Sequence, residues 1–119
     1  MKYDLENRLI QFAVDIIKVA DHSMSNSFAT NHLCKQLIRS STAAALNYGE
    51  AQSAESKKDF LHKMKIALKE LRESMVNLKI QKEANLIKEI AEVDRLIDEN
   101  NQLISIFVSS IRTSQSKSS

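Results

Sequence analysis

The residues whose types and spacing could do chemistry in this 119-residue chain are, first of all, a row of basic side chains between residues 58 and 79. They recur at steps of four, three, four, three and seven residues, which places them along one side of a helix. We call this row the basic stripe, and it consists of Lys58, His62, Lys65, Lys69, Arg72 and Lys79. A stripe of this length extends about 30 Å and could follow a phosphate backbone. The spacing therefore predicts a surface that binds nucleic acid.

The charge of the chain is unevenly distributed, and the stripe lies in its most basic segment. The formal net charge is only +2, but residues 56–82 hold eight bases against three acids, whereas residues 83–119 hold four bases against six acids. Two interpretations remain open: a nucleic-acid surface, or a solvated helix face that the acidic segment partly neutralises. The stripe contains no aromatic residue, which argues against the stacking of bases on it.

The histidine, cysteine and serine side chains form no recognisable catalytic or metal-binding motif. His22, His32 and His62 lie in different segments without a paired ligand at helical spacing, so we predict no metal site. Cys34 is the only cysteine, which excludes an internal disulfide, favours a buried structural role and suits a reducing cytosol. No nucleophile, base and orienting group can be assembled, so we predict that the chain is not an enzyme and needs no cofactor.

A second polar group surrounds the end of the second predicted helix. It consists of Arg39, Asn47, Tyr48, Glu50 and Glu55. One interpretation is a buried hydrogen-bonded network that holds this connection and an oligomer contact together. The other is a patch that faces a ligand. We favour the structural interpretation.

Helices must position these residues, because the chain has no proline and a single glycine. These counts exclude β-sandwiches and glycine-rich nucleotide loops, both of which need glycine in their turns. Apolar residues recur at steps of three and four, which predicts four helices and a disordered tail. Their predicted ranges are 4–20, 27–52, 56–81 and 86–113, with the tail at 114–119. Short connections favour an all-α, antiparallel up-down-up-down four-helix bundle, formed by residues 1–119 as a single domain.

Several residues mark the ends of these helices. Asp4 and Ser56 are predicted N-caps, and Ser56 begins a capping-box-like pattern with Asp59. Asn85 is the predicted turn or cap residue between the last two helices. Gly49 could end the second helix or lie within it, and we predict the latter because the following residues contain no other stop signal.

Two features of the helix interiors also need a structural explanation. Residues 40–46, SSTAAAL, are small, and small side chains allow another helix to approach closely. Asn100 and Asn101 interrupt the apolar stripe of the last helix. A kink and a solvated stretch are the alternatives at that point.

Two segments carry a resemblance to a known family. Residues 36–74, QLIRSSTAAALNYGEAQSAESKKDFLHKMKIALKELRES, and residues 3–18, YDLENRLIQFAVDIIK, closely resemble the bacterial four helix bundle proteins. These are best known from intervening sequences of large-subunit ribosomal RNA genes, and they look related to the accessory variability proteins of diversity-generating retroelements. The resemblance is carried most specifically by Gln36, Leu37, Arg39, Ser40, Asn47, Tyr48, Glu50, Ala51, Glu55, Ser56, Lys58, Asp59 and Phe60. Gly49 departs from the pattern, since the family usually has alanine there.

The resemblance implies a ring-shaped homopentamer around a central channel and no known enzymatic activity. For the retroelement relatives it also implies a basic surface that binds RNA or DNA and a reverse transcriptase partner. Our leading hypothesis is a non-catalytic, cytoplasmic oligomer that binds structured RNA through the basic stripe. The alternative is a scaffold for a partner enzyme, such as a reverse transcriptase, without direct binding of nucleic acid. The chain has no run of 18 apolar residues and no signal-peptide pattern, so we predict no membrane contact.

Overall fold

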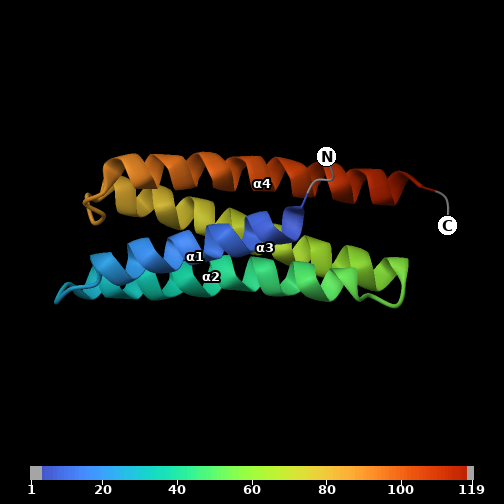
Figure 1. The fold of residues 1–119 in the computed structure, drawn as a ribbon, viewed down its shortest axis with the longest axis horizontal. Coiled ribbons are helices and arrows are strands. Elements are labelled where there is room, and N and C mark those ends of the chain that lie inside the picture. Colours follow the sequence, from blue (N-terminus) through green and yellow to red (C-terminus); the bar gives the residue numbers. More distant parts are fainter. Residues whose placement is uncertain (1–3, 118–119) are drawn as a thin grey trace.

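Four antiparallel helices lie side by side along the long axis of the computed structural model, which describes residues 4–117 (Figure 1). They are α1 (Leu5–Ser23), α2 (Phe28–Gln52), α3 (Lys57–Glu83) and α4 (Ile90–Ser116), and together they measure 52 × 26 × 21 Å. The most extensive packing is between α2 and α3, followed by α1 with α2 and α3 with α4, whereas α1 and α4 touch least. The predicted all-α four-helix bundle is confirmed.

The core is apolar because each helix turns one row of large side chains inward. The largest of these, all fully buried, include Leu9, Phe12, Ile16, Leu37, Met64, Leu71, Leu78, Leu96, Leu103 and Phe107. Two aromatic rings meet at the edge of this core, where Tyr48 packs edge-on against Phe107 with ring centroids 5.7 Å apart. Sustained spacings of three and four produce these rows, as the sequence predicts.

The helix ends follow the predicted capping chemistry. The side chains of Asp4 and Ser56 each accept a hydrogen bond from the backbone N–H three residues on, at 3.1 and 3.0 Å, so both predicted N-caps are confirmed. Asn85 has a positive φ of 58°, the left-handed conformation that asparagine tolerates better than most residues. This residue reverses the chain between α3 and α4, as predicted.

The structure corrects several predicted boundaries. Helix α1 continues to residue 23 instead of 20, and α3 to residue 83 instead of 81. Helix α4 begins at residue 90 instead of 86, because the preceding turn directs Ile87 into the core, where it is only 2% exposed. Residues 114–116 belong to α4, although they were predicted as disordered tail, and residues 118 and 119 lie outside the described part. The Lys57 ammonium donates to the Lys117 carbonyl at 2.6 Å, which holds this end of α4 against α3.

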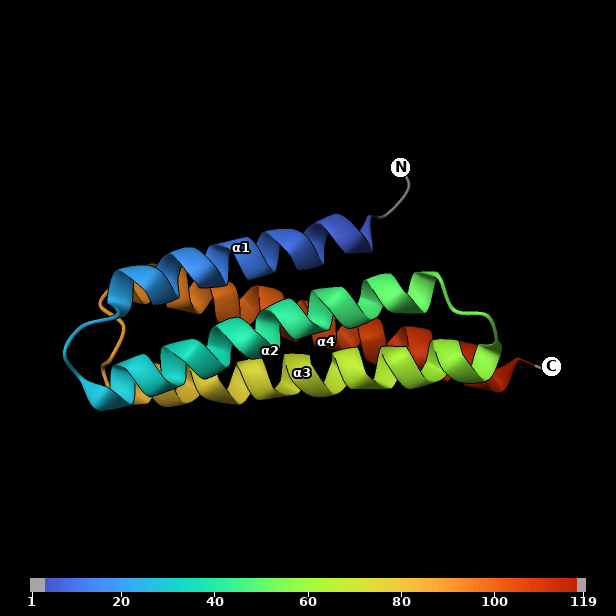
Figure 2. The same cartoon turned by 90° about the horizontal axis from the view of Figure 1, so that it is seen from below.

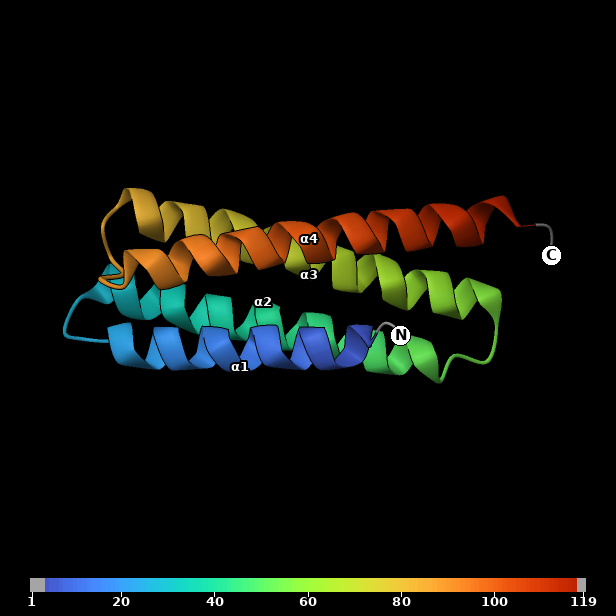
Figure 3. The same cartoon turned by 45° about the horizontal axis from the view of Figure 1, so that its top comes forward.

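The first helix is shorter than the other three. It has 19 residues, against 25 in α2 and 27 in both α3 and α4. It begins well short of the end that holds the α2–α3 connection (Figures 2 and 3). That end of the bundle is therefore built from three helices.

Asn100 is neither at a kink that interrupts the helix nor in a solvated stretch. It is fully buried, and α4 is continuous from residue 90 to residue 116. One orientation of the side-chain amide gives hydrogen bonds to both its nitrogen and its oxygen. In that orientation the nitrogen donates to the Leu71 carbonyl at 3.0 Å, and the oxygen accepts from the Met75 N–H at 3.1 Å. The side chain interrupts the apolar stripe of α4 because it binds the backbone of α3. The next residue, Asn101, is exposed.

Gly49 lies inside α2, as predicted, and its substitution provides a test of the local geometry. A Cβ atom at this position would meet nothing within 4 Å apart from the helix itself. Because glycine within a helix is about 0.5–1 kcal/mol less favourable than alanine, Gly49→Ala is expected to raise the free energy of unfolding by about that amount. Urea denaturation followed by circular dichroism measures this, and a decrease would contradict the open surroundings seen here.

Candidate nucleic-acid interface

The structure places the whole basic stripe on the outward face of α3. All six side chains are exposed, because the buried row of α3 occupies the opposite side of the helix. That buried row contains Met64, Ala67, Leu71, Ser74, Met75 and Leu78. Helices α2 and α4 cover the two flanks between these faces. The stripe is thus a continuous exposed edge of the bundle.

The cations of the stripe have no carboxylate partner among the described residues. Over residues 4–117, none of the six forms a salt bridge. The paired cations of α3 lie outside the stripe: Lys63 binds Glu50 at 2.7 Å and Lys82 binds Asp94 at 2.6 Å. These hydrogen bonds raise the pKa of Lys63 and Lys82. Among the described residues, a carboxylate of α4 therefore pairs with Lys82, whereas none pairs with a residue of the basic stripe.

An apolar side chain fills the seven-residue step of the stripe. Val76 lies between Arg72 and Lys79 at helical spacing, and it is 57% exposed. Together with Ile80 it lines a shallow apolar depression of about 530 Å³ at the C-terminal end of α3. The sequence did not predict this patch, because the residue type alone does not show whether a valine is exposed or buried.

Arg39, the first residue of the second polar group, joins α2 to α3. Its guanidinium donates to both carboxylate oxygens of Glu70, at 3.2 and 3.3 Å, and to the carboxylate of Glu73. The hydrogen bond to Glu73 is the main cause of a raised pKa of Arg39, and the charge of Glu70 adds to it. This arrangement is a clamp on the outside of the bundle, because the Arg39 side chain is exposed.

The other members of this group make separate contacts. Asn47 donates to the Ala43 carbonyl of its own helix at 2.9 Å. Tyr48 packs on the core, Glu50 binds the Lys63 ammonium, and Glu55 is exposed in the α2–α3 connection. The five residues therefore do not form one buried network. Arg39, Asn47, Tyr48 and Glu50 make four separate contacts along α2, and Glu55 lies beyond the end of that helix.

A row of ion pairs along the seam between α1 and α4 was not predicted. The Arg8 guanidinium binds the Glu99 carboxylate at 2.5 and 2.9 Å. Further along, the Arg95 guanidinium binds Asp15 at 2.9 Å, and the His22 imidazole lies 3.9 Å from Glu89. A signal was present in the sequence, since charged residues recur at steps of seven on α1 and of three to four on α4. It becomes informative only once α1 and α4 are known to be antiparallel neighbours.

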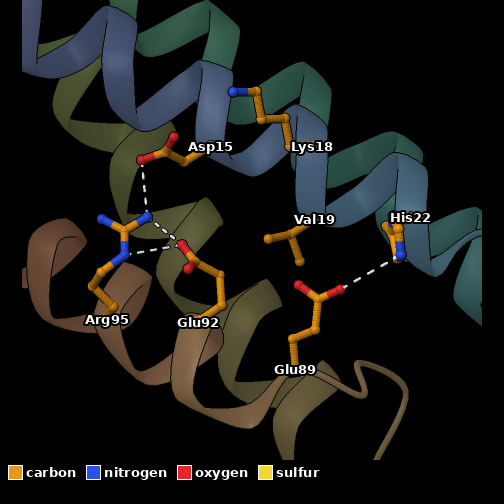
Figure 4. Close-up of a pocket in the computed structure, with 7 residues that line it drawn as sticks. All are labelled: Asp15, Lys18, Val19, His22, Glu89, Glu92 and Arg95. Atoms are coloured by element: carbon orange, nitrogen blue, oxygen red, sulfur yellow. Dashed lines mark hydrogen bonds and ion pairs between the residues drawn. The ribbon is translucent and has the colours of Figure 1, made fainter.

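This seam contains a pocket of about 340 Å³ between the two helices (Figure 4). Arg95 lies at one end of the pocket, where hydrogen bonds to Glu92 and then Asp15 raise its pKa. The His22–Glu89 contact lies at the other end, and Val19 lies between them (Figure 4). Asp15 and Glu92 bind the Arg95 guanidinium, Glu89 lies beside His22, and no serine, threonine or cysteine is among the residues that line the pocket. Its geometry suits the attachment of α1 to α4 better than catalysis.

The single cysteine of the chain is a core residue. Cys34 is fully buried, burial raises the pKa of its thiol, and its Sγ lies 3.7 Å from the Gln81 side-chain oxygen. Among residues 4–117, no three His, Cys, Asp or Glu side chains converge on a possible metal position. No helix in this range is long and apolar enough to cross a membrane.

Comparisons with known proteins agree on a family. The family model described as "23S rRNA-intervening sequence protein" matches residues 1–109. A solved structure from Bacteroides thetaiotaomicron VPI-5482, described as a protein with unknown function from the S23 ribosomal protein family, superposes with a TM-score of 0.81. The two chains are 25% identical over 91% of this chain and 98% of the other. No curated protein matches the chain.

Proposed function

Because the chain belongs to the 23S rRNA-intervening sequence protein family, we propose that it is a non-catalytic, oligomeric helical bundle that binds structured RNA in the cytoplasm through the basic stripe. The observation that carries this proposal is the exposed row of cations on α3, which no described carboxylate neutralises. Like charges at helical spacing repel one another and lower helix stability. An anionic ligand along the stripe would remove that repulsion.

Self-association into a ring-shaped homopentamer is part of the proposal. Ile10 and Ile17, seven residues apart on α1, are 48% and 40% exposed, and Leu46 on α2 is 67% exposed. Contiguous exposed apolar patches are typical of surfaces that bind a protein, and Ile10 and Ile17 lie on one side of α1. Light scattering is expected to give a mass of five times the 13.5 kDa chain, and a monomer mass would contradict the ring. Several copies would also multiply weak contacts to one RNA molecule by avidity.

The experiment that tests RNA binding is a filter-binding titration with a structured RNA over a range of salt concentrations. Contacts between lysines and phosphates release counterions, which lowers the logarithm of the binding constant by about 0.7–0.9 per contact for each tenfold rise in salt. With five Lys or Arg side chains in the stripe, we expect a slope of about −4 per protomer. Absence of binding at low salt, or binding that does not depend on salt, would contradict the proposal.

A second candidate is a scaffold that holds a partner enzyme, such as a reverse transcriptase, without binding nucleic acid. The apolar depression around Val76 and Ile80 supports this candidate, because it offers a surface for another protein. Affinity purification with and without nuclease separates the two functions. A partner enzyme retained after nuclease treatment, together with no affinity for purified RNA, favours the scaffold.

A further inference from the structure

We propose that the basic stripe recognises the paired phosphate backbones of an RNA duplex, in preference to a single strand, and that it does so without reading the base sequence. This inference rests on the proposed function, since it names the class of RNA that the same surface binds. Three properties of α3 carry it: the shape of the stripe, its lack of stacking side chains, and the absence of amide and hydroxyl groups along it.

The shape of the stripe suits a rigid, extended ligand. From residue 58 to residue 79 the helix advances about 31 Å, which is long enough to reach several successive phosphates of a duplex. Helix α3 lies at one edge of the bundle (Figures 1 and 2), and all six side chains of the stripe are exposed. The pocket between α1 and α4 and the cavity of about 480 Å³ between the two connections at one end of the bundle contain no residue of the stripe. The shallow depression at the C-terminal end of α3 contains one, Lys79.

The composition of the stripe argues against unpaired bases. Proteins that bind single strands combine a basic groove with aromatic side chains on which the bases stack. The stripe contains no aromatic ring besides the imidazole of His62, and the exposed side chain in its seven-residue step, Val76, is aliphatic. The most exposed aromatic residue of the described part, Phe28 at 84%, lies on α2 and already stacks on His32 with ring centroids 5.9 Å apart.

The stripe also lacks the amide and hydroxyl groups that read base edges. Its lysine and arginine side chains can read guanine only in an accessible major groove, and their contacts to phosphate fix position without reading sequence. The deep major groove of duplex RNA is inaccessible to side chains, so duplexes are recognised mainly by shape and through phosphates and 2′-hydroxyls. A row of lysines that lies across a duplex can make these backbone contacts for any sequence.

The first test compares binding of the full chain to a 20-base-pair RNA duplex and to each of its separated strands. Duplexes release about 0.9 counterions per contact and single strands about 0.7. Five contacts therefore predict about tenfold tighter binding of the duplex at 0.1 M salt, with a second duplex of unrelated sequence bound equally well. Equal or tighter binding of the single strands would overturn the duplex preference but leave RNA binding intact. Failure to bind any of these RNAs would overturn the proposed function as well.

The second test adds a contact instead of removing one. Val76→Lys fills the gap between Arg72 and Lys79 at an exposed helical position, where lysine is well tolerated. We expect the salt dependence for the duplex to steepen by about one unit of slope. The control variant Ile90→Lys makes the same kind of exchange at the exposed start of α4 and should leave the slope unchanged. An unchanged slope in Val76→Lys, or an equal steepening in both variants, would overturn the placement of the duplex along the stripe.

Discussion

Changing Lys65, Lys69 and Arg72 together to glutamate is expected to weaken RNA binding by at least about 100-fold at 0.1 M salt. The three side chains are exposed at the centre of the stripe, so the exchange removes three contacts and introduces three charges that repel phosphate. Each lost contact costs about 0.7–0.9 logarithmic units per tenfold change in salt, and the repulsion adds to that loss. Filter binding against the same structured RNA measures the effect.

A charge-matched control separates the stripe from the net charge of the molecule. Lys18, Lys35 and Lys88 are also exposed, and they lie on α1, on α2 and in the α3–α4 connection. Changing these three to glutamate alters the net charge by the same amount away from α3. We expect a much smaller loss of affinity, caused only by the long-range field. Equal losses in the two triple variants would mean that the stripe is not the binding surface.

The largest expected effect on stability comes from Asn100→Asp. The amide nitrogen that donates to the Leu71 carbonyl would become a carboxylate oxygen in a fully buried position. A buried charge without a partner typically costs about 3–5 kcal/mol, a large fraction of the 5–15 kcal/mol that stabilises an average domain. Urea denaturation at pH 7 is therefore expected to show a severely destabilised or unfolded variant.

The effect of this substitution should depend on pH in a defined direction. Burial raises the pKa of the introduced carboxyl in the folded state above its unfolded value of about 3.9. The folded state then binds more protons, so the stability of the variant falls as the pH rises from about 4 towards 7. Asn101→Asp is the matched control, since the neighbouring residue is exposed. We expect this substitution to change the free energy of unfolding very little at pH 4 and at pH 7. Equal stability of the two variants at pH 7 would contradict the buried position of Asn100 and its hydrogen bonds to the backbone of α3.

Much of the fold could be predicted from the sequence because local rules determine it. The row of apolar residues on each helix, the caps at Asp4 and Ser56, and the position of Gly49 within α2 all follow from short-range patterns. Asn100 could not be placed in the same way. Its partners, Leu71 and Met75, lie on another helix, and the sequence alone does not show which asparagine faces a backbone. The predicted start of α4 at residue 86 was wrong for a related reason. Ile87 is apolar and buried, as a helix residue of the core would be, but it lies in the turn before α4.

The candidate site was predictable to the extent that it lies on one helix. The six residues of the basic stripe share a face because of their spacing, and the structure places all of them at the surface. Their lack of carboxylate partners depends on how α2 and α4 pack on α3, which no local pattern contains. The same limit applies to Arg39, whose clamp on Glu70 and Glu73 joins two helices, and to the ion pairs between α1 and α4.

The seam between α1 and α4 has a consequence for how the molecule opens. Its ion pairs are partly solvated, and pairs of this kind contribute about 0–1 kcal/mol each, so α1 is held chiefly by its apolar packing on α2. Separation of α1 would leave α2, α3 and α4 joined by the remaining two interfaces. The backbone amides of α1 are therefore expected to exchange with deuterium through a local opening of lower free energy than global unfolding. The bundle would then consist of a three-helix cooperative unit and one helix that detaches before the rest unfolds.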